Sequence, residues 1–223
     1  MTHTSSHTIQ VAGLCGSLRH GSFTRMALQV ALAGAQEAGA QTHLIDLRAY
    51  QLILCDGKED ESGYPRDVFT LREDVRAAQG IILATPEYHG GYSGVLKNAL
   101  DLMGFEEFEG KMLGLVGVSG GMMGAFGALN NLRAVGRALH AWVIPEQASI
   151  PEAWKVFDGS GTLKDHALEK RLKDVGRQVA RFAYLHTSAQ AQAFLRAWES
   201  APVNPGGSKD EPPKDTAVSS SEA

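Results

Sequence analysis

The chain has 223 residues, of which 43% are hydrophobic and 21% charged, and its formal net charge is −4. This length fits one domain with tails, because a domain usually spans roughly 100–200 residues. A mildly acidic chain with few aromatic residues offers neither a basic field nor a stacking platform, so we expect no nucleic acid partner.

The two cysteines and the N-terminal segment argue against secretion and against a metal site. Cys15 lies in an apolar run and is expected to be buried, whereas Cys55 lies in a polar loop. Their spacing matches no zinc site, and two cysteines do not provide a disulfide framework for a domain of this size. Both points fit a reducing compartment. Residues 1–8 lack the layout of a secretion signal, and no apolar run reaches the ~20 residues of a membrane helix. We expect a cytoplasmic protein that is not membrane-bound and holds no metal.

Short apolar runs alternate with segments of helical period. The predicted elements, in chain order, are a strand at 9–15, a helix at 22–39, a strand at 42–47, a loop at 50–66, a helix at 67–78, a strand at 80–85, a helix at 93–103, a strand at 112–118, a helix ending near 140, a strand at 141–150 and mostly helix over 162–198. Ser93 is the expected N-cap of its helix. Pro145 argues that the last strand is an edge, contains a bulge or ends there.

The order of these elements predicts an α/β fold. The run Ile81-Ile82-Leu83-Ala84 does not alternate, as expected of a strand buried on both faces of a parallel sheet. Five strands with intervening helices fit a flavodoxin-like three-layer sandwich, with strand order 2-1-3-4-5 and helices on both faces, better than a six-stranded dinucleotide-binding sheet. We assign residues 1–200 to this domain. Residues 201–223 have almost no apolar side chains and are expected to form a disordered tail.

The loop after the first strand has the features of a phosphate site. It reads Gly-Ser-Leu-Arg-His-Gly-Ser-Phe-Thr-Arg over 16–25 and leads into a helix. A helix N-terminus attracts phosphate, and hydroxyl groups and a guanidinium add donors; the candidates are Ser17, Arg19, Ser22 and Thr24. Ordinary capping, with Arg19 solvated, is the alternative. The Walker A and Gly-x-Gly-x-x-Gly patterns are absent, so a mononucleotide such as FMN fits better than a pyrophosphate.

The loop after the third strand makes the pattern specific. It reads Thr-Pro-Glu-Tyr-His-Gly-Gly-Tyr-Ser-Gly-Val-Leu-Lys-Asn-Ala-Leu-Asp over 85–101. Together with the first loop, it resembles the NADPH-dependent FMN reductase family, which includes quinone, azo-dye and chromate reductases, and the resemblance covers about residues 9–185. It implies that the phosphate is held by Ser17, Arg19, Ser22 and Thr24, with Phe23 beside them. It also implies that the isoalloxazine ring is lined by Pro86, Glu87, Tyr88, His89 and Gly90, and on its other side by Ser119, Gly120 and Gly121.

Two of these positions depart from the family pattern, since Thr24 and His89 stand where the family more often has Asn. Thr24 still carries a hydrogen-bonding group that can reach a phosphate. His89 contacts the flavin, faces the acceptor or is merely a loop residue, and the sequence leaves these alternatives open.

Other candidates have plainer interpretations. The segment 120–127 lies beside the cofactor or simply packs a helix closely on the sheet. Lys97 and Asp101 form an ordinary surface pair or lie at a subunit contact, and the acidic run 56–61 is a solvated loop. The tryptophans are expected in packing or at an interface rather than against the flavin; they are Trp142, Trp154 and Trp198.

The function follows from the resemblance. No triad and no metal-ligand cluster appears in the sequence, so we name no catalytic residue and leave the chemistry to FMN. The expected activity is a ping-pong transfer of electrons from NADPH or NADH through FMN to a quinone, azo compound, free flavin or oxidised metal ion, in a homodimer or homotetramer. The alternatives are a flavodoxin-type electron carrier and a flavin-binding regulatory protein without direct NAD(P)H turnover. The mild charge and Arg19 argue against the carrier.

Overall fold

The computed structural model describes residues 8–158 and 160–201. The described residues fall into two compact units, which divide after Leu185. The first unit contains the whole sheet, and the second contains helix α8 (Ala189–Glu199). The predicted tail lies almost entirely outside the described residues, so its disorder stays a prediction. Over the described part of the chain, no helix is long and apolar enough to cross a membrane.

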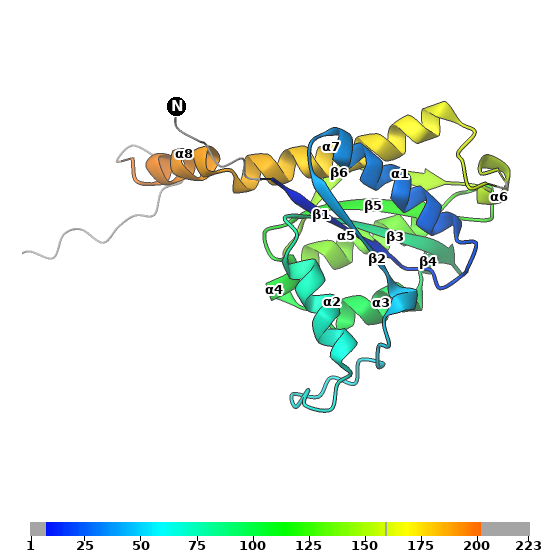
Figure 1. The fold of residues 1–223 in the computed structure, drawn as a ribbon, viewed down its shortest axis with the longest axis horizontal. Coiled ribbons are helices and arrows are strands. Elements are labelled where there is room, and N and C mark those ends of the chain that lie inside the picture. The colour runs from blue at the N-terminus through cyan, green and yellow to red at the C-terminus, as the bar shows by residue number, and fades with distance from the viewer. Residues whose placement is uncertain (1–7, 159, 202–223) are drawn as a thin grey trace, which may run out of the picture. The chain divides into compact units, whose positions relative to one another are not determined.

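The sheet has the predicted topology. Its parallel strands run in the spatial order β2-β1-β3-β5-β6 (Figure 1), and their bounds are β1 Gln10–Cys15, β2 Gln41–Asp46, β3 Gly80–Tyr88, β5 Met112–Val118 and β6 Trp142–Ile150. The sixth strand, β4 (Gly91–Tyr92), has two residues and pairs antiparallel with the end of β3. Without β4 the order is the expected 2-1-3-4-5, so the flavodoxin-like fold is confirmed.

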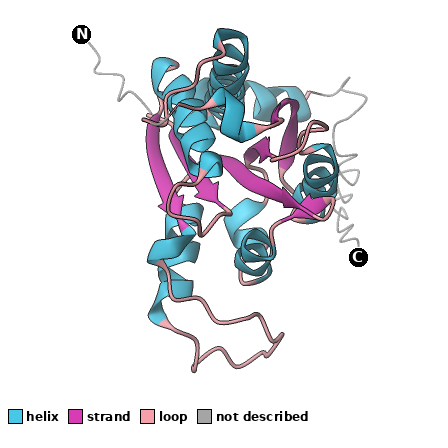
Figure 2. Ribbon diagram, turned by 90° about the vertical axis from the view of Figure 1, so that its right-hand side faces the viewer, coloured by secondary structure: helices cyan, strands magenta, loops and turns pink. Residues whose placement is uncertain are grey.

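Helices cover both faces of the sheet, as Figures 1 and 2 show. One face packs against α1 (Phe23–Glu37) and α7 (His166–Thr187). The other face packs against α2 (Arg66–Arg76), α3 (Gly94–Asp101) and α5 (Phe126–Ala138). The remaining short helices are a 3-10 turn at Leu47–Ala49, α4 at Phe105–Phe108 and α6 at Ala153–Val156.

Local sequence signals explain several of these elements. The Ser22 and Ser93 hydroxyls cap α1 and α3, each by accepting a hydrogen bond from the backbone N–H three residues later. Residues Ile81–Leu83 of β3 are fully buried, as the lack of alternation predicted. Cys15 is buried, and this burial raises the pKa of its thiol, whereas Cys55 is exposed; both are free.

The helices α1 and α7 touch at their backbones, through Gly34 and Gly176. A Cβ at Gly176 would lie 1.8 Å from the carbonyl oxygen of Ala31, and one at Gly34 would lie 2.1 Å from that of Lys173. Beside this crossing, hydrogen bonds from Lys173 and then Arg177 lower the pKa of the Glu37 carboxyl. The crossing therefore fixes how α7 lies against α1.

The edge strand β6 contains the irregularity that Pro145 predicted. Its register against β5 shifts between Leu113 and Leu115. The Arg133 guanidinium, from α5, donates to the carbonyl oxygens of Ile144 at 3.0 Å and Pro145 at 2.7 Å, and to Gln147 Oε1 at 2.8 Å. Arg133 thus satisfies backbone carbonyls next to the register shift.

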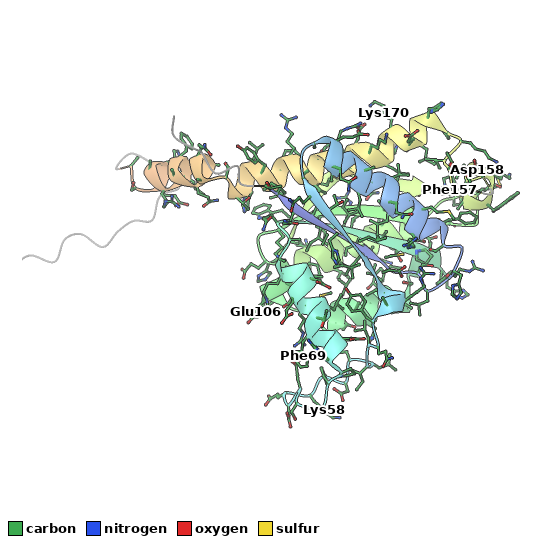
Figure 3. The ribbon with its side chains drawn as sticks, in the orientation of Figure 1. Lys58, Phe69, Glu106, Phe157, Asp158 and Lys170 are labelled. Carbon is green, nitrogen blue, oxygen red and sulfur yellow. The ribbon has the colours of Figure 1, made fainter. Side chains whose placement is uncertain are left out.

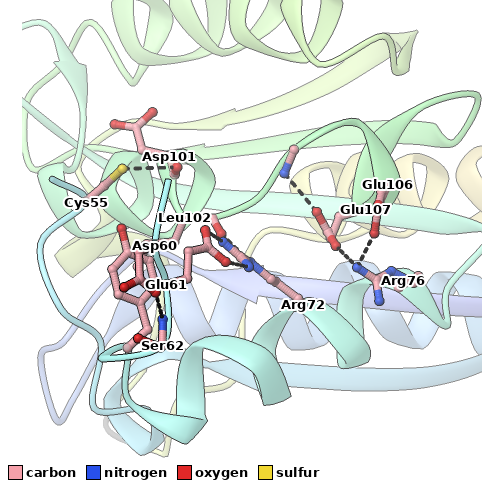
Figure 4. Close-up of polar contacts among 12 residues, drawn as sticks. Cys55, Asp60, Glu61, Ser62, Arg72, Arg76, Asp101, Leu102, Glu106 and Glu107 are labelled. Carbon is pink, nitrogen blue, oxygen red and sulfur yellow. Dashed lines mark hydrogen bonds and ion pairs between the residues drawn. The ribbon is translucent and has the colours of Figure 1, made fainter. Parts of the chain in front are cut away.

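The loop between β2 and α2 is tied to the domain by side chains. The Asn98 side chain accepts a hydrogen bond from the Cys55 N–H and donates one to the Ile53 carbonyl, both at 2.9 Å. Glu61 forms two hydrogen bonds with Arg72, which also donates to the Leu102 carbonyl at 2.6 Å (Figure 4). Residues 56–60 are exposed, as expected of a solvated loop, whereas Glu61 at the end of the run is held in place by Arg72.

Another part of this loop extends away from the sheet. Lys58 lies near its far end (Figure 3). Lys97 and Asp101 form an ion pair with an N–O distance of 2.6 Å, and both side chains are partly exposed. Their position at a subunit contact stays a prediction.

Candidate functional site

The loops at the carboxyl ends of the strands enclose a cleft of about 510 Å³. Such a volume suits a small-molecule ligand, and the position is where ligands of parallel α/β sheets bind. The cleft is lined by Ser17, Arg19, His20, Gly21, Ser22, Phe23, Thr24, Pro86, Glu87, Tyr88, Val118, Ser119, Gly120, Ala153 and Trp154.

The first loop is anchored where it leaves β1. The Gly16 N–H donates to the Ala84 carbonyl at 2.8 Å, and the Ser93 hydroxyl donates to the Gly16 carbonyl at 2.5 Å. A Cβ at Gly16 would lie 2.8 Å from the Leu96 Cβ, so only glycine fits this close approach. These contacts fix the phosphate-site candidates against β3 and α3.

The predicted phosphate donors gather at the N-terminus of α1. Ser17, Ser22 and Thr24 are each less than 5% exposed, and all three residues line the cleft. The first turn of α1 carries no acidic residue, so nothing there offsets the positive end of the helix dipole. The arrangement is suited to an anion.

Arg19 and Arg25 differ in their partners. The Arg25 Nε lies 3.0 Å from Asp46 Oδ2, and Arg48 pairs with the same carboxylate. Burial alone would raise the pKa of Asp46, but hydrogen bonds from Arg48 and the two positive charges lower it overall. Arg19 lies at the cleft, and within the described residues its guanidinium pairs with no carboxylate. Arg19 is therefore the guanidinium available to a ligand.

The second wall of the cleft is a tight hairpin that the sequence did not predict. Strand β3 continues to Tyr88 and turns through His89 and Gly90 into β4. Both turn residues have positive φ, 52° and 76°, as a type I′ hairpin turn requires. That turn favours Asn-Gly, which gives a backbone reason for the Asn more common in the family at position 89. His89 and Gly90 are exposed and do not line the cleft.

Glu87 holds this hairpin against α5. Its Oε2 accepts a hydrogen bond from the Ala128 N–H at 2.9 Å, near the N-terminus of the helix. At the same contact, a Cβ on Gly127 would lie 2.3 Å from the Gly90 carbonyl oxygen. The Glu87 carboxylate is thus engaged by the helix end, while the residue still lines the cleft.

The third wall is the loop after β5. Ser119 and Gly120 line the cleft, whereas Gly121 does not; its N–H donates to the Ser119 hydroxyl at 3.1 Å. Gly127 packs closely on the hairpin and Gly120 lies at the cleft. The close packing is therefore present, and a place beside the cofactor stays a prediction.

The cleft also includes residues that the sequence reasoning missed. They are His20, Gly21, Val118, Ala153 and Trp154. Trp154 follows β6, and the rule that ligands bind at the carboxyl ends of strands would have singled out that loop as well. None of the three tryptophans is buried, so of the two expected roles burial in the core does not apply, and a place at an interface stays a prediction.

The chemistry of the cleft is that of binding and orientation. The lining holds an unpaired arginine, buried hydroxyls, a helix N-terminus and backbone groups of tight turns, which fit a phosphate and a flat ring. In the described part of the chain, no group of three or more His, Cys, Asp and Glu side chains is arranged to hold a metal ion.

Comparison with known proteins points in the same direction. Residues 9–155 match a family model described as NADPH-dependent FMN reductase. An NAD(P)H-dependent FMN reductase of Pseudomonas aeruginosa is 37% identical over 167 residues, covering 72% of this chain and 87% of the relative. The FMN-dependent NADPH-azoreductase of Staphylococcus saprophyticus is 30% identical and covers 76% of this chain and 92% of its own length. The structure of the flavoenzyme NAD(P)H:(acceptor) oxidoreductase FerB from Paracoccus denitrificans superposes with a TM-score of 0.62 at 23% identity, over 80% of this chain and 99% of that one, which supports the fold.

Proposed function

Because the chain belongs to the NADPH-dependent FMN reductase family, it is an FMN-dependent oxidoreductase that uses NAD(P)H, and we propose that the cleft described above is its flavin site. The phosphate is held at the N-terminus of α1 by Arg19 and the hydroxyls of Ser17, Ser22 and Thr24, with Phe23 beside them. The observation that carries this assignment is the unpaired Arg19 guanidinium beside buried hydroxyls at a helix end.

The isoalloxazine ring lies between the hairpin 86–90 and the loop 119–121. In this assignment His89, Gly90 and Gly121 act through the backbone of the loops they shape, because none of these residues lines the cleft. FMN, when bound, supplies the hydride and electron chemistry. The residues that line the cleft would hold and orient the ring.

The substrates use the mouth of the cleft in turn, which gives a ping-pong cycle. NADPH or NADH enters first and leaves before a small acceptor enters, and the acceptors are quinones, azo compounds, free flavin or oxidised metal ions. The enzyme is cytoplasmic in this proposal, and nucleic acid is not a partner. The free Cys15 and Cys55 are consistent with a reducing compartment.

Anaerobic rapid mixing tests this cycle. FMN-loaded protein is mixed with NADPH, and in a second series with NADH, while the flavin absorbance is followed; a quinone is then added. We expect fast bleaching and then recovery driven by the quinone, with parallel lines in steady-state double-reciprocal plots. Bound flavin that neither nucleotide bleaches would contradict the cycle and favour the electron carrier, and intersecting lines would contradict the ping-pong order.

We also propose that copies of the chain associate through apolar side chains near the mouth of the cleft. Met122 and Met123 are 81% and 89% exposed, and Phe126 and Leu18 are exposed as well. Met122, Met123 and Phe126 lie within five residues of the chain, and exposed apolar side chains that lie close together mark interaction surfaces. Light scattering should give two or four times the mass of one chain, and the double variant Met122→Glu, Met123→Glu should give one. A single-chain mass for the unaltered protein would contradict this assembly.

A further inference from the structure

Trp154 has an unusual position for a large apolar side chain. Its side chain is 60% exposed, yet it lines the same cleft as the phosphate loop and the hairpin. Trp142 is equally exposed, at 61%, but does not line the cleft. A tryptophan side chain in contact with water does not contribute the hydrophobic free energy that its burial would give. A ligand in the cleft would bury it and recover that free energy.

The backbone around Trp154 is fixed to two walls of the cleft. The Ala153 N–H donates to the Ser119 carbonyl at 3.0 Å, and the Glu152 N–H donates to the Gly121 carbonyl at 3.1 Å. Phe157, at the end of α6 (Figure 3), stacks on Phe23 with ring centroids 5.5 Å apart and an interplanar angle of 17°. The short helix is thus held between the loop after β5 and the start of α1.

Lys155 occupies one face of the indole. Its Nζ lies 4.9 Å from the centroid of the Trp154 ring and 2.6 Å from Glu152 Oε1. A cation over one face leaves the opposite face and the ring edge available for contact. The salt bridge to Glu152 holds the ammonium in that position.

We propose that Trp154 contacts the isoalloxazine ring of bound FMN and helps to retain it, an inference that rests on the proposed flavin site. The ring is the part of FMN with a planar, largely apolar surface, whereas the ribityl chain and the phosphate are polar. Aromatic pairs in offset or edge-to-face arrangement are stabilising beyond the area that they bury. The phosphate loop and Trp154 therefore recognise opposite ends of the same ligand.

Titration with FMN and with riboflavin, followed by flavin fluorescence, separates these two ends. Trp154→Ala should weaken binding of both ligands by the same factor, about tenfold, because both carry the ring. Arg19→Ala should weaken binding of FMN alone. Trp154→Phe, which keeps an aromatic ring, should retain most of the affinity, and the matched control Trp142→Phe should bind both ligands as the unaltered protein does.

Tryptophan fluorescence provides a readout independent of activity. FMN should quench more of the emission in Trp142→Phe, which keeps Trp154, than in Trp154→Phe. Equal quenching, unchanged FMN affinity in Trp154→Ala, or a loss confined to FMN would each overturn the ring contact while the flavin site stands. If the unaltered protein itself fails to bind FMN, the proposed flavin site fails instead.

Discussion

Replacement of Gly176 by valine is expected to destabilise the protein by about 3 kcal/mol. The valine Cβ would overlap the Ala31 carbonyl, 1.8 Å away, so one helix must move. Both helices pack on the same face of the sheet, which means that a shift of α7 also disturbs the core beneath it. The measurement is urea unfolding followed by circular dichroism.

Gly94 provides the control for this substitution. It is also a helical glycine, the first residue of α3, but a Cβ there meets nothing within 4 Å. Gly94→Ala should therefore leave the unfolding midpoint unchanged or raise it slightly, because alanine restricts the unfolded chain. If Gly176→Val unfolds at the same urea concentration as Gly94→Ala, the backbone contact between α1 and α7 is not as close as described.

Replacement of Arg19 by alanine is expected to weaken FMN binding by about 10- to 100-fold, since a hydrogen bond to a charged group contributes about 1.5–3 kcal/mol. Lysine at position 19 should restore part of the loss, because it supplies the charge without the two-pronged geometry. The dissociation constant from flavin fluorescence is the measurement.

Arg25→Ala is the matched control, six residues along the same loop and helix. Its guanidinium is engaged by Asp46 and does not line the cleft, so its loss should change FMN affinity by less than about threefold, the effect of a partly exposed ion pair at most. Equal losses in Arg19→Ala and Arg25→Ala would mean that general positive charge, not a specific contact, attracts the phosphate.

The sequence predicted the fold well because the fold depends on period and order. Buried parallel strands such as 81–83 lack alternation, and the capping serines Ser22 and Ser93 mark helix starts by their chemistry. The site could be placed on three loops for the same reason, since the carboxyl ends of parallel strands share one edge. The identity of the ligand, FMN, was then inferred from the family.

Other features depend on contacts between distant segments, which no local pattern encodes. Gly34 and Gly176 appear in sequence only as glycines that weaken helices, although they allow two backbones to touch. Arg19 and Arg25 carry the same guanidinium group, and they differ because Arg25 forms an ion pair with Asp46. The position of His89 in a turn with positive φ became visible once β3 and β4 were seen to pair.

The irregular strand β6 also limits how the protein can assemble. An open sheet edge with free N–H and C=O groups invites a strand from another molecule, and repeated pairing of this kind builds fibres. Here Pro145 has no N–H to offer, and Arg133 occupies the carbonyl oxygens of Ile144 and Pro145. A foreign strand would have to displace the guanidinium before it could pair in this region. Strand pairing is therefore hindered at this point of the edge.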